Sequence, residues 1–159
     1  MSELNINMNI FALDSDPGLA AEYHCDKHVG KMLLETVQLL STVRIQGNLM
    51  APYKSSYKNH PCTLWVAESM GNYAWLVQLG RALDRQYKLR FKKQHKSGLA
   101  LEQVLDPPIL PDLGVTDFVQ VVPDEYKGSC AISAYRKYYV EDKKSFAKWG
   151  HSKAPAWMV

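Results

Sequence analysis

A short segment near the N-terminus, YHCDKHVGK at residues 23–31, concentrates side chains that bind protons, metals or anions. If this segment is helical, a line of polar side chains runs through it in steps of three or four, because a helix turns by about 100° per residue. The line contains His24, His28, Lys31, Glu35, Gln38 and Thr42. The other directions of the helix are mostly apolar, which is typical of a buried helix. The pattern therefore predicts the wall of a pocket. Its catalytic candidates are His24, His28, Lys31 and Glu35.

Two other interpretations of this polar row stay open. One is the solvated face of an amphipathic helix. The other is a metal site, because histidines four residues apart on a helix can share one zinc ion or another divalent metal. The water-activating glutamate of an HExxH motif is absent, since Cys25 follows His24. The leading expectation is a site without a cofactor, and the metal-binding alternative uses His24, His28 and His60.

Two further groups of residues predict contacts with phosphate. Lys58, Asn59 and His60 stand at the start of an expected helix, where free N–H groups and the positive helix end favour anions. Simple capping of that helix is the alternative. Another group is Arg136, Tyr139 and Lys143, whose spacing of three and four places them on one helix face. Such a face suits phosphate contact and base stacking, and a solvated face with aromatic residues in the core is the alternative.

Helices must position these residues, and the sequence predicts three principal ones. They cover residues 17–46, 61–93 and 129–149. Asp16 is expected to cap the first, and Asn59 or His60 the second. A short helix at 99–105 and a long ordered loop rich in Pro and Gly at 109–128 connect the last two. The predicted fold class is mainly α.

The chain length of 159 residues fits one compact helical domain spanning 1–159. Residues 1–14 are expected to form an N-terminal arm or strand, with Met8 as a second start site, and residues 150–159 a tail that docks on the body. The net charge of +3 permits an anionic partner without demanding one. The three cysteines show no CxxC spacing, which favours a reducing compartment. No signal peptide or membrane span is expected.

Three longer stretches resemble a family of bacteriophage proteins. They are MNIFALDSDPGLAAEYHCDKHVGKMLLETVQLLSTV, KNHPCTLWVAES and AYRKYYVEDKKSFAKW, with HCDKH and NHPC as the specific motifs. The resemblance implies a phage-encoded protein in the cytoplasm of the infected bacterial host. The layout is also similar to the phage pyrimidine-dimer DNA glycosylases, which are small helical enzymes, through LAAEYHCDKHV and CAISAYRKYY.

This second resemblance implies base excision by an amine, with two departures. Those enzymes attack with the α-amine of a threonine just after the initiator Met, whereas this chain begins Met1-Ser2 with a longer arm. Their essential glutamate falls at Cys25, or at Asp26 with a gap. Within the polar row, Lys31 is the amine that can form a Schiff base.

The leading functional hypothesis is a DNA- or nucleotide-handling phage protein that acts on a base or glycosidic bond. Lys58 and His60 would hold a phosphate at the mouth of the pocket. One alternative is a non-catalytic module that binds a host protein or a signalling nucleotide, and another is a metal-dependent hydrolase that uses His24 and His28.

Overall fold

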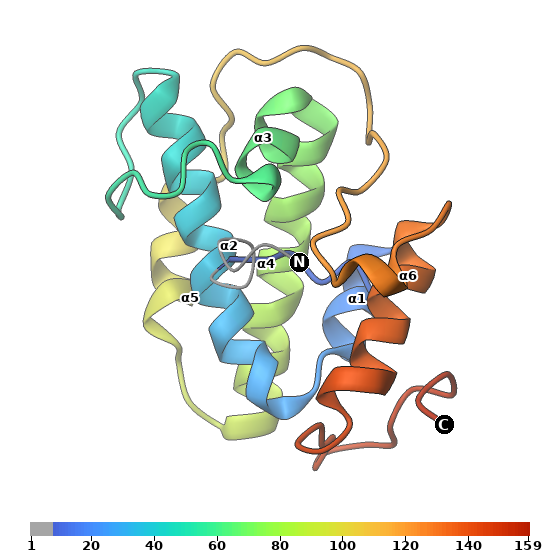
Figure 1. Cartoon of the computed structure of the whole chain (residues 1–159). Helices are drawn as coiled ribbons and strands as arrows, with labels where there is room; N and C mark the ends of the chain where they lie inside the picture. The colour runs from blue at the N-terminus through green and yellow to red at the C-terminus, as the bar shows by residue number, and fades with distance from the viewer. Residues whose placement is uncertain (1–7) are drawn as a thin grey trace.

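The structure is a computed structural model that describes residues 8–159, and in this range it contains helices and no β-strand (Figure 1). The predicted mainly α fold is confirmed. The first seven residues of the predicted arm lie outside the described part of the chain. The α-helices are α1 (Pro17–Tyr23), α2 (Asp26–Gln46), α3 (Pro61–Glu68), α4 (Met70–Phe91), α5 (Lys96–Ala100) and α6 (Ala131–Tyr138). Short 3₁₀ turns follow at Leu101–Gln103 and Asp124–Tyr126, and a π-helical turn at Tyr139–Lys143.

The first predicted helix is divided in two, because His24 and Cys25 have extended backbone with ψ angles of 132° and 160°. No Pro or Gly marks this break between α1 and α2. Its backbone groups bond to distant residues instead. Arg90 donates to the His24 carbonyl, and the N–H of Asp26 donates to the carbonyl of Lys148. The break therefore depends on tertiary partners, and a continuous helix was the wrong expectation.

The second and third predicted helices are also divided. Ser69 is extended between α3 and α4, where its hydroxyl donates to the Gly114 carbonyl and accepts from the N–H of Gly71. The third helical region changes from α to π geometry after Tyr138. The predicted caps are present, since Asp16 accepts from the N–H of Leu19 and a histidine precedes Pro61.

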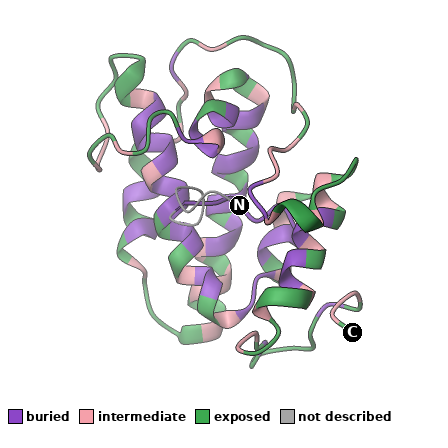
Figure 2. Cartoon of the chain, viewed as in Figure 1, coloured by how far each residue is buried: buried purple, intermediate pink, exposed green. Residues whose placement is uncertain are grey.

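The core lies where α2 and α4 pack together and α1 packs along α4 (Figure 1). The buried residues of α2 and α4 face this core, and the exposed ones face outward (Figure 2). Residues 8–13 have no regular secondary structure and are buried. Trp75 donates to the Ser15 carbonyl, and Arg136 donates to the Leu13 carbonyl. These bonds hold the N-terminal segment against the helices.

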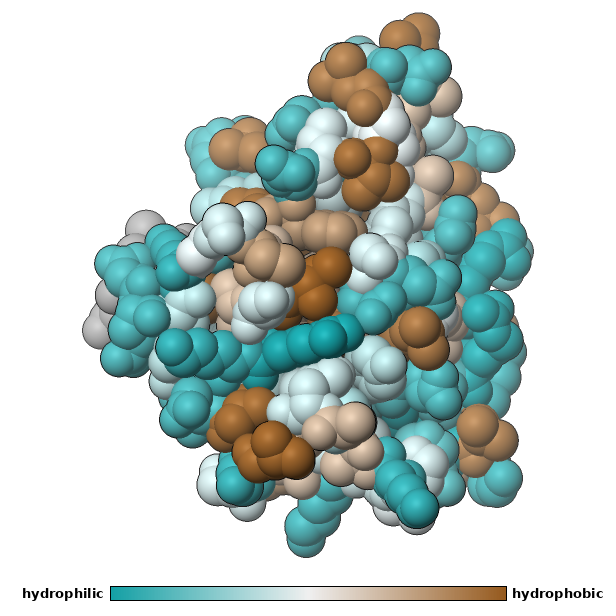
Figure 3. Space-filling view, turned by 90° about the vertical axis from the view of Figure 1, so that its right-hand side faces the viewer, coloured by the Kyte–Doolittle hydropathy of each residue, from teal (hydrophilic) through white to brown (hydrophobic). Residues whose placement is uncertain are grey.

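The C-terminal tail lies beside α1 and α6, where Trp157 contacts the rings of Tyr23 and Tyr139 at centroid distances of 5.8 and 6.0 Å. On this side of the molecule, hydrophilic side chains predominate and hydrophobic ones form small separate groups (Figure 3). Within residues 8–159, no helix has the length and apolar character needed to cross a bilayer.

Candidate active site

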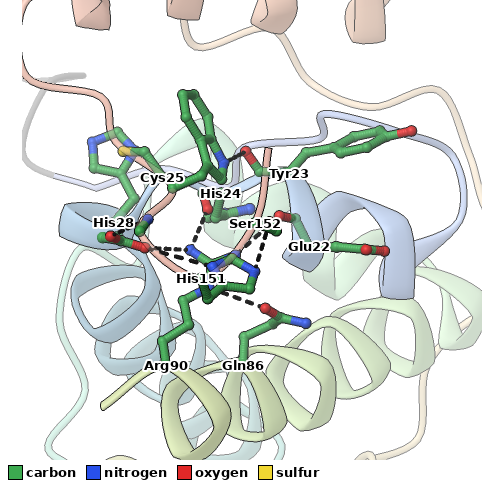
Figure 4. Close-up of polar contacts among 12 residues, drawn as sticks. Glu22, Tyr23, His24, Cys25, His28, Gln86, Arg90, His151 and Ser152 are labelled. Atoms are coloured by element: carbon green, nitrogen blue, oxygen red, sulfur yellow. Dashed lines mark hydrogen bonds and ion pairs between the residues drawn. The ribbon is translucent and has the colours of Figure 1, made fainter. Parts of the chain in front are cut away.

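Arg90 on α4 holds the break between α1 and α2 together (Figure 4). Its guanidinium donates to the carbonyls of His24 and Glu22 at 2.6 and 2.9 Å, and to the Asp26 carboxylate at 3.1 Å. Gln86, one turn earlier on α4, accepts from Arg90 Nε at 3.0 Å. The Arg90 side chain is only 2% exposed. The buried Arg90 side chain, with four hydrogen bonds, therefore positions the backbone at His24 and Cys25, which lie between α1 and α2.

Asp26, the first residue of α2, connects this break to the C-terminal tail. Its carboxylate accepts from the N–H of Gly150 at 2.9 Å, and His151 lies 4.0 Å away. Beside it, Trp149 donates its indole N–H to the Tyr23 carbonyl at 3.0 Å. The tail thus lies against the break and ties together segments more than 120 residues apart.

His24 does not lie on α2 with the rest of the predicted row, because it belongs to the break. Its ring is fully buried, and Nδ1 donates to the Ala20 carbonyl at 2.6 Å. Nε2 is then the unprotonated nitrogen, and it has no hydrogen-bond partner. Burial lowers the pKa of His24 to about 4. This histidine is therefore neutral at pH 7 and is separated from Lys31 and Glu35.

His28 lies on α2, and its Nδ1 is 2.7 Å from the hydroxyl of Tyr139. That hydroxyl also accepts from the N–H of Cys25 at 3.3 Å and lies 3.7 Å from its sulfur. Burial, followed by the charges of His24 and of nearby lysines, lowers the pKa of His28 to about 3. Burial also raises the pKa of the Cys25 thiol. At neutral pH these three side chains therefore form an uncharged hydrogen-bonded chain.

Tyr139 was expected to contact nucleic acid, but its side chain lies inside the protein. It is fully buried, so its ring is not presented at the surface for stacking on a base. Arg136 from the same predicted face is also engaged internally. It donates to the Leu13 carbonyl at 2.7 Å and pairs with Asp14 at 2.9 Å. Of the predicted face, Lys143 is half-buried, and it forms no ion pair among residues 8–159.

Three lysines surround the buried His28 ring. Lys27, Lys31 and Lys143 each lower its pKa through their charge, so all three lie within electrostatic reach of it. Lys27 Nζ lies 4.6 Å from the centroid of the Phe146 ring, and Lys143 Nζ lies 4.5 Å from a second aromatic ring, that of Tyr138. Cation–π contacts of this kind position an ammonium group without neutralising its charge. This lysine group is therefore suited to contact phosphates.

Glu35 lies on α2 one turn after Lys31 and is 6% exposed. Its Oε1 accepts from the backbone N–H of Asn9 at 2.9 Å. Burial raises the pKa of Glu35 from 4.5 to about 7, while the Asn9 hydrogen bond and the Lys31 charge act in the opposite direction. Among residues 8–159, no ion pair within 4.0 Å joins Lys31 to Glu35. The polar row thus supplies one carboxyl that exchanges protons near neutral pH.

Asn9, which was not predicted as a site residue, positions this carboxyl. Its side-chain oxygen accepts from the Tyr135 hydroxyl at 3.0 Å, and its amide donates to the Val121 carbonyl at 2.9 Å. The thiol of Cys62 lies 3.9 Å from the same oxygen. The sequence could have indicated Asn9, because it is the only polar residue of the apolar run MNIFAL and a buried amide needs hydrogen-bond partners. Nothing in the sequence distinguishes Arg90 from the other basic residues around it.

Lys58, Asn59 and His60 precede α3, as predicted. His60 is buried, and its Nδ1 accepts from the N–H of Cys62 at 3.0 Å. Its ring therefore caps the helix, which was the alternative interpretation. Lys58 and Asn59 are exposed, so both remain open to a phosphate.

The metal-binding alternative finds no geometric support in the part of the chain that the structure describes. Within residues 8–159, no group of three or more His, Cys, Asp or Glu side chains is placed to hold a metal ion. His24 and His28 also lie on different elements, on either side of the start of α2.

Comparison with known proteins identifies one family. The family model described as pyrimidine dimer DNA glycosylase matches residues 8–97. The matched region begins at the buried Met8 and includes the break, Glu35 and Arg90, whereas α6 and the tail lie beyond it. The curated proteins contain no match. The solved structures contain none either.

Proposed function

We propose that this chain, which belongs to the pyrimidine dimer DNA glycosylase family, excises a base from DNA with the amine of Lys31 and the carboxyl of Glu35. The observation that carries the proposal is the buried Glu35 carboxyl with a pKa of about 7, inside the matched region. A general acid works best when its pKa lies near the working pH. Family membership supports a DNA glycosylase-type function, and the geometry suggests which residues perform it.

In the proposed reaction, the ammonium group of Lys31 first releases a proton to solvent, and the resulting amine attacks C1′ of the deoxyribose. The N–C1′ bond forms and the glycosidic bond breaks, and the departing base takes the proton of neutral Glu35. The resulting carboxylate then accepts a proton from the new ammonium group. Opening of the sugar ring transfers the C1′–O4′ electron pair to oxygen, which takes the proton back from Glu35, and leaves a protonated Schiff base between Lys31 and C1′.

Lys31 suits this role because it is exposed on α2, while its charge reaches both Glu35 and His28. The histidines are uncharged at pH 7, so they contribute shape and hydrogen bonding to the site and no proton. The aromatic side chains of Phe11, His28 and Phe146 lie together, with the Phe11 and His28 rings stacked at 4.8 Å and Phe146 at 5.7 Å from His28.

DNA is the proposed partner. Lys27 and Lys143 would contact backbone phosphates beside the reacting nucleotide, and Lys58 and Asn59 would hold a phosphate near α3. The resemblance to bacteriophage proteins extends the proposal to an enzyme that acts in the cytoplasm of the infected host.

Borohydride trapping tests the amine directly. Reduction should convert the Schiff base with dimer-containing or abasic duplex DNA into a stable adduct, and peptide mapping should place the adduct on Lys31. Lys31→Ala should abolish the adduct, and Lys54→Ala, which removes another exposed lysine, should not. An adduct on the N-terminal peptide would overturn the role of Lys31. Tight binding of DNA without any adduct would overturn the glycosylase proposal in favour of a binding module.

A further inference from the structure

A pocket of about 280 Å³ lies between the start of α1 and the middle of α4, away from the residues proposed to catalyse. It is lined by Asp16, Pro17, Gly18, Gln78, Arg81 and Arg85. The three α4 residues of this lining are spaced by three and four, so they share one face of that helix. A volume of this size exceeds the roughly 30 Å³ that a water molecule occupies in the liquid, so the pocket has room for a phosphate group.

The two pocket arginines differ from every other arginine in the chain. The sequence contains five arginines, and three of them, Arg44, Arg90 and Arg136, donate to backbone carbonyls inside the structure. Arg81 and Arg85 are exposed, and neither forms an ion pair or a hydrogen bond with another residue in the range 8–159. The two arginines without an ion pair or hydrogen bond to the described residues thus line the same cavity.

One carboxylate also faces the pocket. Asp16 accepts from the N–H of Leu19 at 2.9 Å, which commits one of its oxygens to capping α1. With two guanidinium groups and one carboxylate, the lining carries an excess of one positive charge. Guanidinium groups form paired hydrogen bonds to phosphate oxygens, and their planar geometry makes them stronger phosphate ligands than lysine. The expected ligand is therefore a phosphate group.

We propose that Arg81 and Arg85 bind a backbone phosphate of the DNA substrate, at a distance from the nucleotide that reacts. This proposal rests on the proposed function for its ligand. The pocket lies at the N-terminal end of α1 and the break lies at its other end, seven residues later. At 1.5 Å per residue, α1 spans about 10 Å, so the pocket and the break are separated by the length of about three phosphates of one strand at 3.4 Å each. The proposed catalytic residue Lys31 follows the break on α2.

Binding of an undamaged duplex at several salt concentrations tests the site without requiring catalysis. Arg81→Gln combined with Arg85→Gln should lower affinity and reduce the slope of log K against log salt by about 1, the value for one lost phosphate contact. The matched control is Lys54→Gln combined with Lys153→Gln, which removes the same charge from exposed positions elsewhere. A slope that is equal in the arginine variant and the wild type would overturn the proposal.

A second measurement separates a backbone phosphate from a free one. The side-chain NMR signals of Arg81 and Arg85 should shift on addition of the duplex, and millimolar inorganic phosphate should not reproduce the shift. Saturation by inorganic phosphate alone, with no response to the duplex, would overturn the assignment to DNA. Because the arginine variant keeps Lys31 and Glu35, it should still form the borohydride adduct at low salt. If the wild type itself forms no borohydride adduct, the proposed function is refuted, whatever the arginine variant does.

Discussion

Replacement of Glu35 by Gln should change how the stability of the protein depends on pH. Burial raises the pKa of Glu35 from 4.5 to about 7. Between these values the folded protein holds a proton that the unfolded chain has released, so the free energy of unfolding falls as pH rises through this window. At 1.36 kcal/mol for each pKa unit, the ionised carboxylate costs about 3 kcal/mol above pH 7. Gln removes this cost and keeps an oxygen for the Asn9 N–H.

The variant should therefore gain stability relative to the wild type between pH 4.5 and 8. A difference of about 3 kcal/mol corresponds to roughly 10 °C in the midpoint of thermal unfolding for a domain of this size. The measurement is the midpoint of both proteins across this pH range. The difference between them is the informative quantity, because the buried His24 and His28 titrate in both. Their lowered pKa values make the stability of each protein rise with pH up to 6.5.

Glu102→Gln, which changes an exposed glutamate, is the matched control. A constant difference between the wild type and Glu35→Gln from pH 4.5 to 8 would refute the reasoning, since it would mean that Glu35 titrates as it does in the unfolded chain.

The same variant also tests the role of Glu35 in base excision. Excision by the wild type should decline as pH rises through about 7, because neutral Glu35 donates the proton. Glu35→Gln should lose 10²- to 10⁴-fold in rate without loss of DNA affinity.

Three further substitutions have outcomes that follow from the geometry. Arg90→Gln leaves the Asp26 carboxylate and two carbonyls without their donor at a site that is 2% exposed, so it should cost about 3–5 kcal/mol in urea unfolding. A cost below 1 kcal/mol would contradict the structural role of this arginine. Tyr139→Phe removes the partner of His28 Nδ1 and should cost about 1–3 kcal/mol by the same assay. Lys27→Gln combined with Lys143→Gln should reduce the salt slope of DNA binding by up to 2 while leaving stability within about 0.5 kcal/mol, and an unchanged slope would exclude these lysines from the interface.

The helical regions could be predicted from local signals. Apolar periodicity placed helices at 17–46, 61–93 and 129–149, and the structure has helices in all three regions. Asp16 was expected as the first cap and Asn59 or His60 as the second, because a side-chain acceptor before Pro is a local pattern, and the structure has Asp16 and His60. The breaks at His24 and Ser69 have no local signal. They exist because Arg90, on another helix, and Pro111, in a distant loop, bond to the His24 carbonyl and the Met70 N–H, which a continuous helix would otherwise pair internally.

The relative positions of the site residues could be predicted for those that lie on the continuous helix α2. The helix is continuous through Gly30, so His28, Lys31 and Glu35 lie along it as the spacing requires. His24 departs because the break precedes α2. Tyr139 was predicted to face the solvent from its spacing with Arg136 and Lys143. Spacing shows which residues share a helix face, but it does not show whether that face is buried. Phe11 of the N-terminal segment and Trp157 of the tail contact the Tyr139 ring in the π-helical turn, and neither contact can be derived from spacing.

The HCDKH motif combines two opposite electrostatic requirements in five residues. Lys27 is exposed and available to a ligand, and Lys31 is exposed one turn later. His24, Cys25 and His28 are buried, and burial favours the uncharged form of each. Charged imidazoles there would repel the lysines and Arg90 and would require solvation that the core does not provide. A tightly packed polar motif can thus bury uncharged side chains while Asp26 pairs with Arg90 and Lys27 stays exposed.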